Sequence, residues 1–278
     1  MKIGVVGCGS IGTRRAKLLA EMGHEVHCWD TGDAAPVAHR LAGYPFVSVS
    51  APESWPAIGV EAAFVCTPAH THLPVAAEVL KAGCGGVFIE KPLSTSMLAV
   101  QNVVEWCDRL AVVTMGACNM RWAYPSPDPS AQCLALWTCG PLSGWRPGSD
   151  AYRDAGIVLE SAVHDLDVAC HWLGPVRDMD ARGDEDKVTL NVEHERGRSV
   201  IVSDWSTDAK PTREMAWIGP RGTQVCQPKI GDDMYRQEMQ HFLDHVASWT
   251  PTSNPIANAA ETLRWALHAR DLTMKVAA

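Results

Sequence analysis

The fold of this chain is decided by residues 2–12, which read K-I-G-V-V-G-C-G-S-I-G. Residues 2–6 are an apolar run that predicts a buried strand, and residues 13–22 carry alanine and leucine at helical spacing. The pattern G-x-G-x-x-G therefore stands between a strand and a helix. Such a pattern alone is weak evidence, but in this position it is typical of a dinucleotide-binding unit.

Each position of this glycine loop has a physical reason. Gly7 permits the tight turn after the strand, Gly9 lets a pyrophosphate approach the backbone, and Gly12 lets the helix pack on the strand. Ser10 and Ile11 begin the helix, whose first N–H groups have no partner within the helix and can bind a phosphate. We predict that all five residues bind the cofactor.

The next predicted strand, residues 25–30, ends on Asp30, which follows Gly12 by 18 residues. A carboxylate at this place accepts hydrogen bonds from an adenosine ribose, and no arginine follows directly to bind a 2′-phosphate. The pattern favours NAD over NADP. The alternative is that Asp30 only caps a turn, because Arg14 and Arg15 lie close enough in sequence to reach a phosphate.

Strands and helices alternate through the first half of the chain. This alternation predicts a parallel, doubly wound Rossmann sheet of the α/β class, with ligands beyond the carboxyl ends of its strands. A buried strand gains nothing from two adjacent opposite charges, so Glu90-Lys91-Pro92 is expected where a strand leaves the sheet, as is Thr67-Pro68. The further predicted strands are residues 60–67, 86–89 and 111–118, and the predicted helices are residues 74–81 and 97–109.

The second half begins after a segment that breaks regular structure. Three alternating prolines in residues 124–129 exclude a helix or a central strand, and we place the domain boundary in this region. We predict a NAD-binding Rossmann domain in residues 1–118 and a substrate-binding and oligomerisation domain in residues 119–278. The second domain is expected to be α+β with an open, mostly antiparallel sheet. Its predicted strands are residues 132–139, 176–183, 188–195, 199–207 and 213–218, and its late helices are residues 235–249 and 258–275.

Residues 159–173 read as one amphipathic helix between these strands. Apolar residues step by three or four along it, and a polar stripe lies about 100° around the axis, beside the buried face. The stripe consists of Glu160, His164, Asp167 and His171. For His171, and for Asp165 on the same helix, a solvated helix face is an equally good interpretation.

The composition excludes several classes of function. The chain has 278 residues and a formal net charge of −8 without a basic run, so we expect neither a nucleic acid nor a membrane as partner. No apolar stretch approaches the ~18 residues of a membrane span, and the glycine-rich start lacks a signal-peptide pattern, so we expect a cytoplasmic protein. Ten cysteines without a C-x-x-C pair predict reduced thiols. His241 and His245 lack a third ligand at matching spacing, so no metal is expected.

The sequence resembles the glucose-fructose oxidoreductase and inositol dehydrogenase family, written Gfo/Idh/MocA. The resemblance rests on the glycine loop, on Thr67-Pro68 with His72 five residues after the threonine, on Glu90-Lys91-Pro92 and on residues 160–167. These motifs follow the family's order across most of the chain. The cofactor-binding residues that the resemblance adds to the glycine loop and Asp30 are Thr67, Pro68, His72, Glu90 and Lys91.

The resemblance implies that Lys91 is the catalytic lysine. Its ammonium would lie beside the nicotinamide and donate to the reacting oxygen, where it stabilises alkoxide character. Glu90 is expected near the nicotinamide ribose. Pro92 is expected to fix the turn, and a cis peptide bond is one way to do so. A solvated ion pair at the strand end is the alternative for the two charged residues.

The helix of residues 159–173 supplies the other catalytic residues of the resemblance. His164 is similar to the residue that exchanges the substrate hydroxyl proton, a role that suits histidine. Glu160 and Asp167 are expected to position hydroxyls or the imidazole, and Arg121 to bind substrate. Glu160 stands where the inositol dehydrogenases have aspartate, so the substrate stays open.

A closer resemblance is to family members encoded with bacterial surface-sugar pathways. It rests on G-W-R-P at residues 144–147 and D-A-Y-R at residues 150–153. It implies that Trp145 stacks on a pyranose and that Tyr152 and Arg153 bind sugar hydroxyls or a phosphate. Compared with these relatives, the chain is shortened around residues 123–132 and between Arg153 and Gly156, so the pocket is either more open than usual or completed by a partner subunit. The family also implies a homodimer or homotetramer through the second sheet.

These expectations give one predicted function and two alternatives. We predict hydride transfer between NAD and a secondary alcohol or ketone carbon of a sugar, sugar phosphate or nucleotide sugar. The first alternative is redox-assisted glycoside hydrolysis, in which held NAD oxidises a sugar and is later restored. The second is a non-catalytic sensor that binds a dinucleotide and a partner protein, against which the retained Lys91 and His164 argue.

Overall fold

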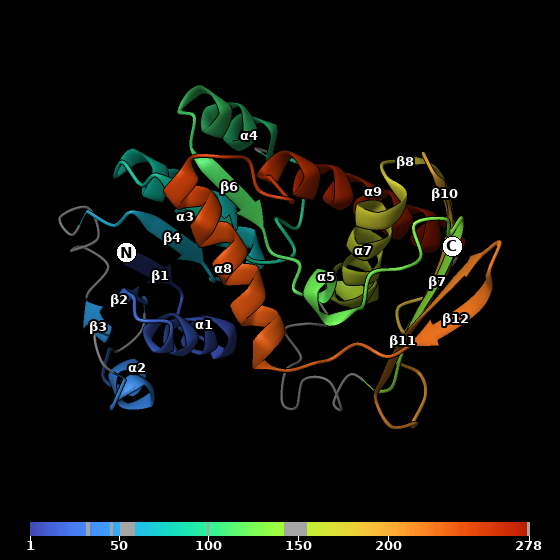
Figure 1. The fold of residues 1–278 in the computed structure, drawn as a ribbon, viewed down its shortest axis with the longest axis horizontal. Coiled ribbons are helices and arrows are strands. Elements are labelled where there is room, and N and C mark those ends of the chain that lie inside the picture. The colour runs from blue at the N-terminus through green and yellow to red at the C-terminus, as the bar shows by residue number, and fades with distance from the viewer. Residues whose placement is uncertain (32–33, 45–46, 51–58, 99, 142–154, 277–278) are drawn as a thin grey trace. The chain divides into compact units, whose positions relative to one another are not determined.

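A computed structural model describes residues 1–31, 34–44, 47–50, 59–98, 100–141 and 155–276 (Figure 1). The chain forms two compact units. The first unit contains Met1–Ala117 and Gly231–Ala260, and the second contains Cys118–Ile230 and Glu261–Ala278. The helix of residues 232–248 thus packs with the first unit, although it follows the second unit's sheet in sequence.

The first unit holds a six-stranded sheet in which every described strand pair is parallel, in the order β3-β2-β1-β4-β5-β6. The predicted Rossmann sheet is therefore confirmed. The register pairs Val6 with Val65 and Val65 with Ile89, so three strands end at one edge. The strands are β1 (Lys2–Val6), β2 (Glu25–Trp29), β3 (Val47–Ser50), β4 (Ala62–Val65), β5 (Gly86–Ile89) and β6 (Val113–Gly116).

Helices flank this sheet, as doubly wound folds require. Helix α2 and strand β3 are additions to the elements predicted from the sequence. Figure 1 shows α8, in orange, among the blue and green elements of the first unit, where it contacts α1 and β6. The helices are α1 (Ser10–Glu21), α2 (Ala34–Leu41), the 3₁₀ turn η2 (Ala69–Thr71), α3 (His72–Lys81), α4 (Val100–Arg109) and α8 (Asp232–Ser248).

The core beneath α8 is aromatic. The ring centroids of Phe64, Phe88 and Phe242 lie 4.8 to 5.5 Å apart, and all three side chains are fully buried. Strands β4 and β5 are buried at every position, which explains their continuous apolar sequences. A Cβ atom on Gly86 would lie 2.4 Å from Val246, so glycine lets α8 approach β5.

The second unit holds a mixed, mostly antiparallel sheet in the order β12-β11-β7-β10-β9-β8, with β7 and β10 the described parallel pair. This confirms the α+β class predicted for it. The strands are β7 (Cys133–Cys139), β8 (Val176–Gly183), β9 (Lys187–His194), β10 (Gly197–Asp204), β11 (Thr212–Gly219) and β12 (Gly222–Cys226). Its helices are α5 (Met120–Ala123), the π-helical turn η4 (Val158–Ala162) and α7 (Val163–Leu173), while α9 (Ile256–Val276) begins in the first unit and continues into the second.

The cysteines and the helices bear on two further predictions, of reduced thiols and of no membrane span. All ten cysteines lie in the described part of the chain as free thiols, and six of them are buried. Over the same part of the chain, no helix combines the length and apolar character needed to cross a bilayer.

Candidate active site

The glycine loop joins β1 to α1 as the sequence predicts. Gly7 has a φ of +88°, and a Cβ atom there would lie 2.7 Å from the Cys66 carbonyl carbon. A Cβ atom on Gly12 would lie 1.8 Å from the Gly7 oxygen. In contrast, a Cβ atom on Gly9 would have no described heavy atom within 4 Å. Gly7 and Gly12 are thus needed for close packing, whereas Gly9 leaves an open approach to the backbone at the start of α1, which fits a pyrophosphate.

Asp30 follows β2 and turns towards the glycine loop. Its Oδ2 accepts a hydrogen bond from the Cys8 backbone N–H at 2.6 Å. This contact holds the carboxylate beside the loop, where the sequence predicts an acceptor for the adenosine ribose. The residues present therefore fit NAD, and the ribose contact itself stays a prediction.

The idea that Arg15 could reach a phosphate is wrong. Its side chain is 1% exposed, and its guanidinium forms ion pairs with Glu90 and with Glu238 of α8. Burial disfavours the charged guanidinium, but the two carboxylates outweigh burial and raise the pKa of Arg15 above its ordinary value. Arg15 is a residue of the core and not of the loop surface.

Glu90-Lys91-Pro92 lies directly after β5, at the edge of the sheet that carries the glycine loop. Glu90 accepts a hydrogen bond from Arg15 Nε at 2.5 Å through Oε1 and one from the Lys91 backbone N–H at 3.2 Å through Oε2. The Lys91–Pro92 peptide bond is cis, which confirms the form considered for this turn. The carboxylate of Glu90 thus connects the core to the backbone of Lys91, while Lys91 itself is only half-buried.

His72 ties two loops of this edge together. One ring nitrogen lies 2.7 Å from the Thr67 carbonyl oxygen and the other 2.9 Å from the Pro92 carbonyl oxygen. Burial lowers the pKa of His72, so the neutral ring donates to one of these two carbonyls at a time. His72 holds the Thr67-Pro68 and Lys91-Pro92 turns in place, and its contact with a cofactor stays a prediction.

The second unit brings together two of the predicted site residues. Arg121 of α5 donates two hydrogen bonds to Asp167 of α7, Nε to Oδ2 at 2.5 Å and Nη2 to Oδ1 at 2.7 Å. Both side chains are 6% exposed. Arg121 Nη1 also lies 3.4 Å from Nδ1 of His171. Asp167 and Arg121 therefore fix each other, which suits a positioning role for both.

The predicted α-helix of residues 159–173 is wrong in its first turn. Residues Val158–Ala162 form a π-helical turn, and α7 begins only at Val163. Such turns are frequent at functional sites, and this one contains Glu160. Glu160 and His164 are both half-buried, so each retains a face towards solvent.

Asp165 is not on a solvated face. It is fully buried, its Oδ2 accepts a hydrogen bond from Thr138 of β7 at 2.9 Å, and Arg213 of β11 lies 3.5 Å from its Oδ1. Burial raises the pKa of this carboxyl group. Asp165 thus fastens α7 to the sheet directly beside His164.

Three predicted substrate residues, Trp145, Tyr152 and Arg153, lie outside the described residues. Glu238 was missed, although the sequence holds a signal for it. It stands in an apolar i, i+4 series of α8 with Met234, Phe242 and Val246, all buried. An acid within such a series indicates a buried partner.

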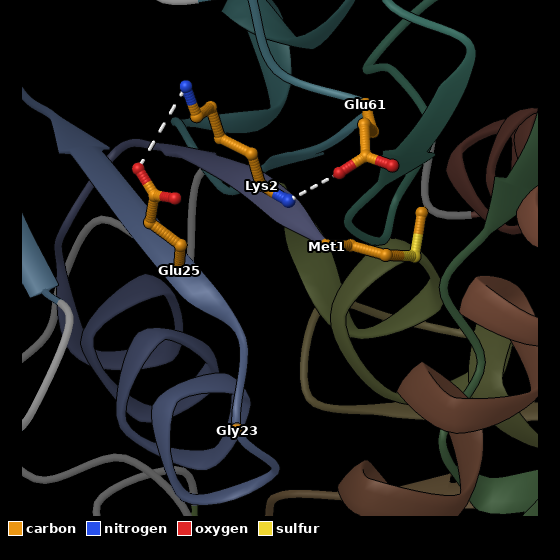
Figure 2. Close-up of a pocket in the computed structure, with 5 residues that line it drawn as sticks. All are labelled: Met1, Lys2, Gly23, Glu25 and Glu61. Carbon is orange, nitrogen blue, oxygen red and sulfur yellow. Dashed lines mark hydrogen bonds and ion pairs between the residues drawn. The ribbon is translucent and has the colours of Figure 1, made fainter.

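A pocket elsewhere in the first unit is not a rival site. It is lined by Met1, Lys2, Gly23, Glu25 and Glu61 (Figure 2). Lys2 and Glu25 begin β1 and β2, so this pocket lies at the amino ends of the strands, whereas ligands of such sheets bind beyond the carboxyl ends. Among the described side chains, no group of three or more His, Cys, Asp or Glu residues could hold a metal ion.

Solved structures share this fold over nearly their whole length. A myo-inositol dehydrogenase from Corynebacterium glutamicum has a TM-score of 0.86 at 16% identity, covering 99% of this chain and 97% of that one. The UDP-N-acetylglucosamine 3-dehydrogenase GnnA from Acidithiobacillus ferrooxidans has a TM-score of 0.83 at 18% identity, with 98% and 97% covered. The WlbA (WbpB) dehydrogenase from Thermus thermophilus, in complex with NAD and alpha-ketoglutarate, has a TM-score of 0.78 at 18% identity, with 98% and 95% covered.

Sequence comparison matches the first part of the chain to a family model. No curated protein matches the chain significantly. Residues 1–117 match the family described as "Oxidoreductase family, NAD-binding Rossmann fold". These residues contain the glycine loop, Asp30 and Glu90-Lys91-Pro92. The first 117 residues of the chain are thus similar to the NAD-binding part of the Gfo/Idh/MocA oxidoreductases.

Proposed function

We propose that this protein is an NAD-dependent oxidoreductase acting on a secondary alcohol or ketone carbon of a sugar, sugar phosphate or nucleotide sugar. The observation that carries the proposal is the placement of Lys91. It follows β5 at the edge of the sheet where the glycine loop and Asp30 stand, and its backbone is held by Glu90. A loop that fits a dinucleotide and a half-buried lysine at the same sheet edge suit hydride transfer to or from an alcohol carbon.

Each residue of the proposed site has its own role in the reaction. Gly9 and Asp30 would hold NAD, which would supply the hydride acceptor for the alcohol carbon. Lys91 stabilises negative charge on the reacting oxygen, and His164 takes up or returns the hydroxyl proton. Asp167, fixed by Arg121, and Glu160 orient substrate hydroxyls or the imidazole.

The substrate class is supported by resemblance and by fold. The Trp145 and Tyr152-Arg153 motifs resemble those of surface-sugar enzymes, and two of the similar structures are named for myo-inositol and UDP-N-acetylglucosamine. A sugar offers several hydroxyls, which suits a proposed site that contains the carboxylates of Glu160 and Asp167 and the guanidinium of Arg121. We propose a homodimer or homotetramer through the second unit's sheet as the working assembly.

Native mass spectrometry and an absorbance assay test the proposal. Native mass spectrometry of the purified protein is expected to show bound NAD. A panel of free sugars, sugar phosphates and nucleotide sugars, including the two named compounds, is then supplied with NAD, and one class is expected to produce NADH. Bound NAD with glycoside cleavage and no net NADH would favour the redox-assisted hydrolase instead. Bound NAD with no reaction on any compound would favour the sensor.

A further inference from the structure

Helices α1 and α2 carry three arginines near the glycine loop, and two of them are directed away from it. Arg15 is buried against Glu90 and Glu238. Arg14 pairs with Asp232 of α8 at 3.5 Å, and its guanidinium lies 5.1 Å from the centre of the Tyr235 ring. Neither arginine points its charge at the loop.

Arg40, in the last turn of α2, does contact the loop. Its Nη2 donates a hydrogen bond to the Cys8 carbonyl oxygen at 2.8 Å, and the rest of the side chain is exposed. The same carbonyl accepts a hydrogen bond from Thr13 Oγ1 at 2.9 Å. The backbone N–H of Cys8 donates the hydrogen bond that Asp30 accepts. A carboxylate and a guanidinium therefore bind the two polar backbone groups of one loop residue.

This pair of charges bears on the choice between NAD and NADP. The two cofactors differ at the 2′ position of the adenosine ribose, which carries a hydroxyl in NAD and a phosphate in NADP. A carboxylate accepts a hydrogen bond from the hydroxyl and repels the phosphate, whereas a guanidinium binds phosphate oxygens through two parallel hydrogen bonds. The sequence directly after Asp30 lacks an arginine, but the fold supplies one ten residues later, from the next helix.

We propose that Arg40 is the binding group for the 2′-phosphate, so that this protein binds NADP as well as NAD, with Asp30 keeping NAD the tighter ligand. The inference rests on the cofactor assignment of the proposed function. It makes Arg40 a residue for cofactor selectivity, with no part in hydride transfer. Loss of the guanidinium should therefore change the affinity for one dinucleotide far more than for the other.

Calorimetric titration of the full-length protein with NAD and with NADP tests this inference without a substrate. Arg40→Met is expected to weaken NADP binding roughly tenfold and NAD binding by less than about twofold. Asp30→Asn is expected to shift the ratio of affinities towards NADP. Arg14→Met, which removes a nearby arginine that pairs with Asp232, is the matched control and should leave the ratio unchanged. Retained NAD binding in Arg40→Met also shows that the variant is folded.

Two results would overturn the inference. One is an Arg40→Met variant that loses affinity for both dinucleotides equally, or for neither. The other is a wild-type protein that binds NAD but not NADP. A wild-type protein that binds neither dinucleotide would instead refute the cofactor assignment, and the inference with it.

Discussion

Arg15 of α1 and Glu238 of α8 form a fully buried ion pair at 2.8 Å, although 223 residues separate them in the sequence. The same guanidinium binds Glu90, whose second carboxylate oxygen accepts a hydrogen bond from the Lys91 backbone N–H. The guanidinium also lies 4.4 Å from the centre of the Phe88 ring. This network connects α8 to the turn that carries the proposed catalytic lysine.

Replacement of Arg15 by methionine should strongly destabilise the protein. The change leaves two buried carboxylates without their shared cation, which costs about 3–5 kcal/mol when one partner of a buried ion pair is removed. Thermal and urea unfolding measure the loss. Arg14→Met is the matched control, because the neighbouring pair with Asp232 is exposed and contributes little. An Arg15→Met variant as stable as Arg14→Met would refute the network.

Alanine at Gly9 and alanine at Gly12 should affect two different properties, NAD binding and stability respectively. A Cβ atom at Gly9 has open space, so Gly9→Ala should keep the stability of the protein and weaken NAD binding by about tenfold or more, because the methyl group stands where a pyrophosphate approaches. A Cβ atom at Gly12 collides with the Gly7 carbonyl, so Gly12→Ala should lower the unfolding temperature. Calorimetry and thermal unfolding separate the two effects. Unchanged NAD affinity in Gly9→Ala would place the cofactor elsewhere.

The sequence predicted those parts of the candidate site that are formed by residues close together in the sequence. The glycine loop, Asp30 after β2 and Glu90-Lys91-Pro92 after β5 are local patterns, and each stands where it was expected. The parallel sheet of the first unit was predicted from the alternation of strands and helices along the sequence.

Contacts between distant segments were not predictable in this way. The partners of Arg15 depend on how α8 returns to the first unit, and the contact of Arg40 depends on the path of α2. The burial of Asp165 depends on Thr138 and Arg213, which come from two different strands. Helical periodicity also gives no sign of a π-helical turn, since a single turn is too short to show a different repeat.

Acid should destabilise the protein partly through His72. Burial lowers the pKa of this residue, so between that pKa and the ordinary value of about 6.5 the unfolded chain binds more protons than the folded one. Stability therefore falls as the pH drops below about 6.5. Thermal unfolding between about pH 5 and 7.5 should show a shallower fall in His72→Asn than in the wild type.

The exposed His70 provides the control for this measurement. It lies two residues from His72 in the same unit, and His70→Asn leaves the buried His72 ring and its two carbonyl contacts in place, so the fall in stability due to His72 should persist. His194 contributes an acid-dependent loss of the same sign, because burial lowers its pKa as well. A His72→Asn variant with a fall as steep as that of the wild type would contradict the buried, neutral state of His72.

Arg121 and Asp167 should be strongly coupled in stability. A double-mutant cycle of Arg121→Met and Asp167→Asn is expected to give a coupling energy of at least about 1 kcal/mol, because each single change leaves a buried polar group without its partner. The exposed pair Arg264–Glu261 is the control cycle and should show much weaker coupling. Additive effects of the Arg121 and Asp167 changes would contradict the pairing.

Lys91 is proposed to support hydride transfer with NAD. The most direct test compares the rates of NADH formation by the wild type and by Lys91→Met on the substrate that the panel identifies. NAD affinity and unfolding temperature are measured in parallel, so that a lost cofactor or a lost fold is not mistaken for lost chemistry. We predict unchanged NAD binding and a turnover lower by roughly 10² to 10⁴ in the variant. A variant that binds NAD and turns over at a near wild-type rate would contradict the claim.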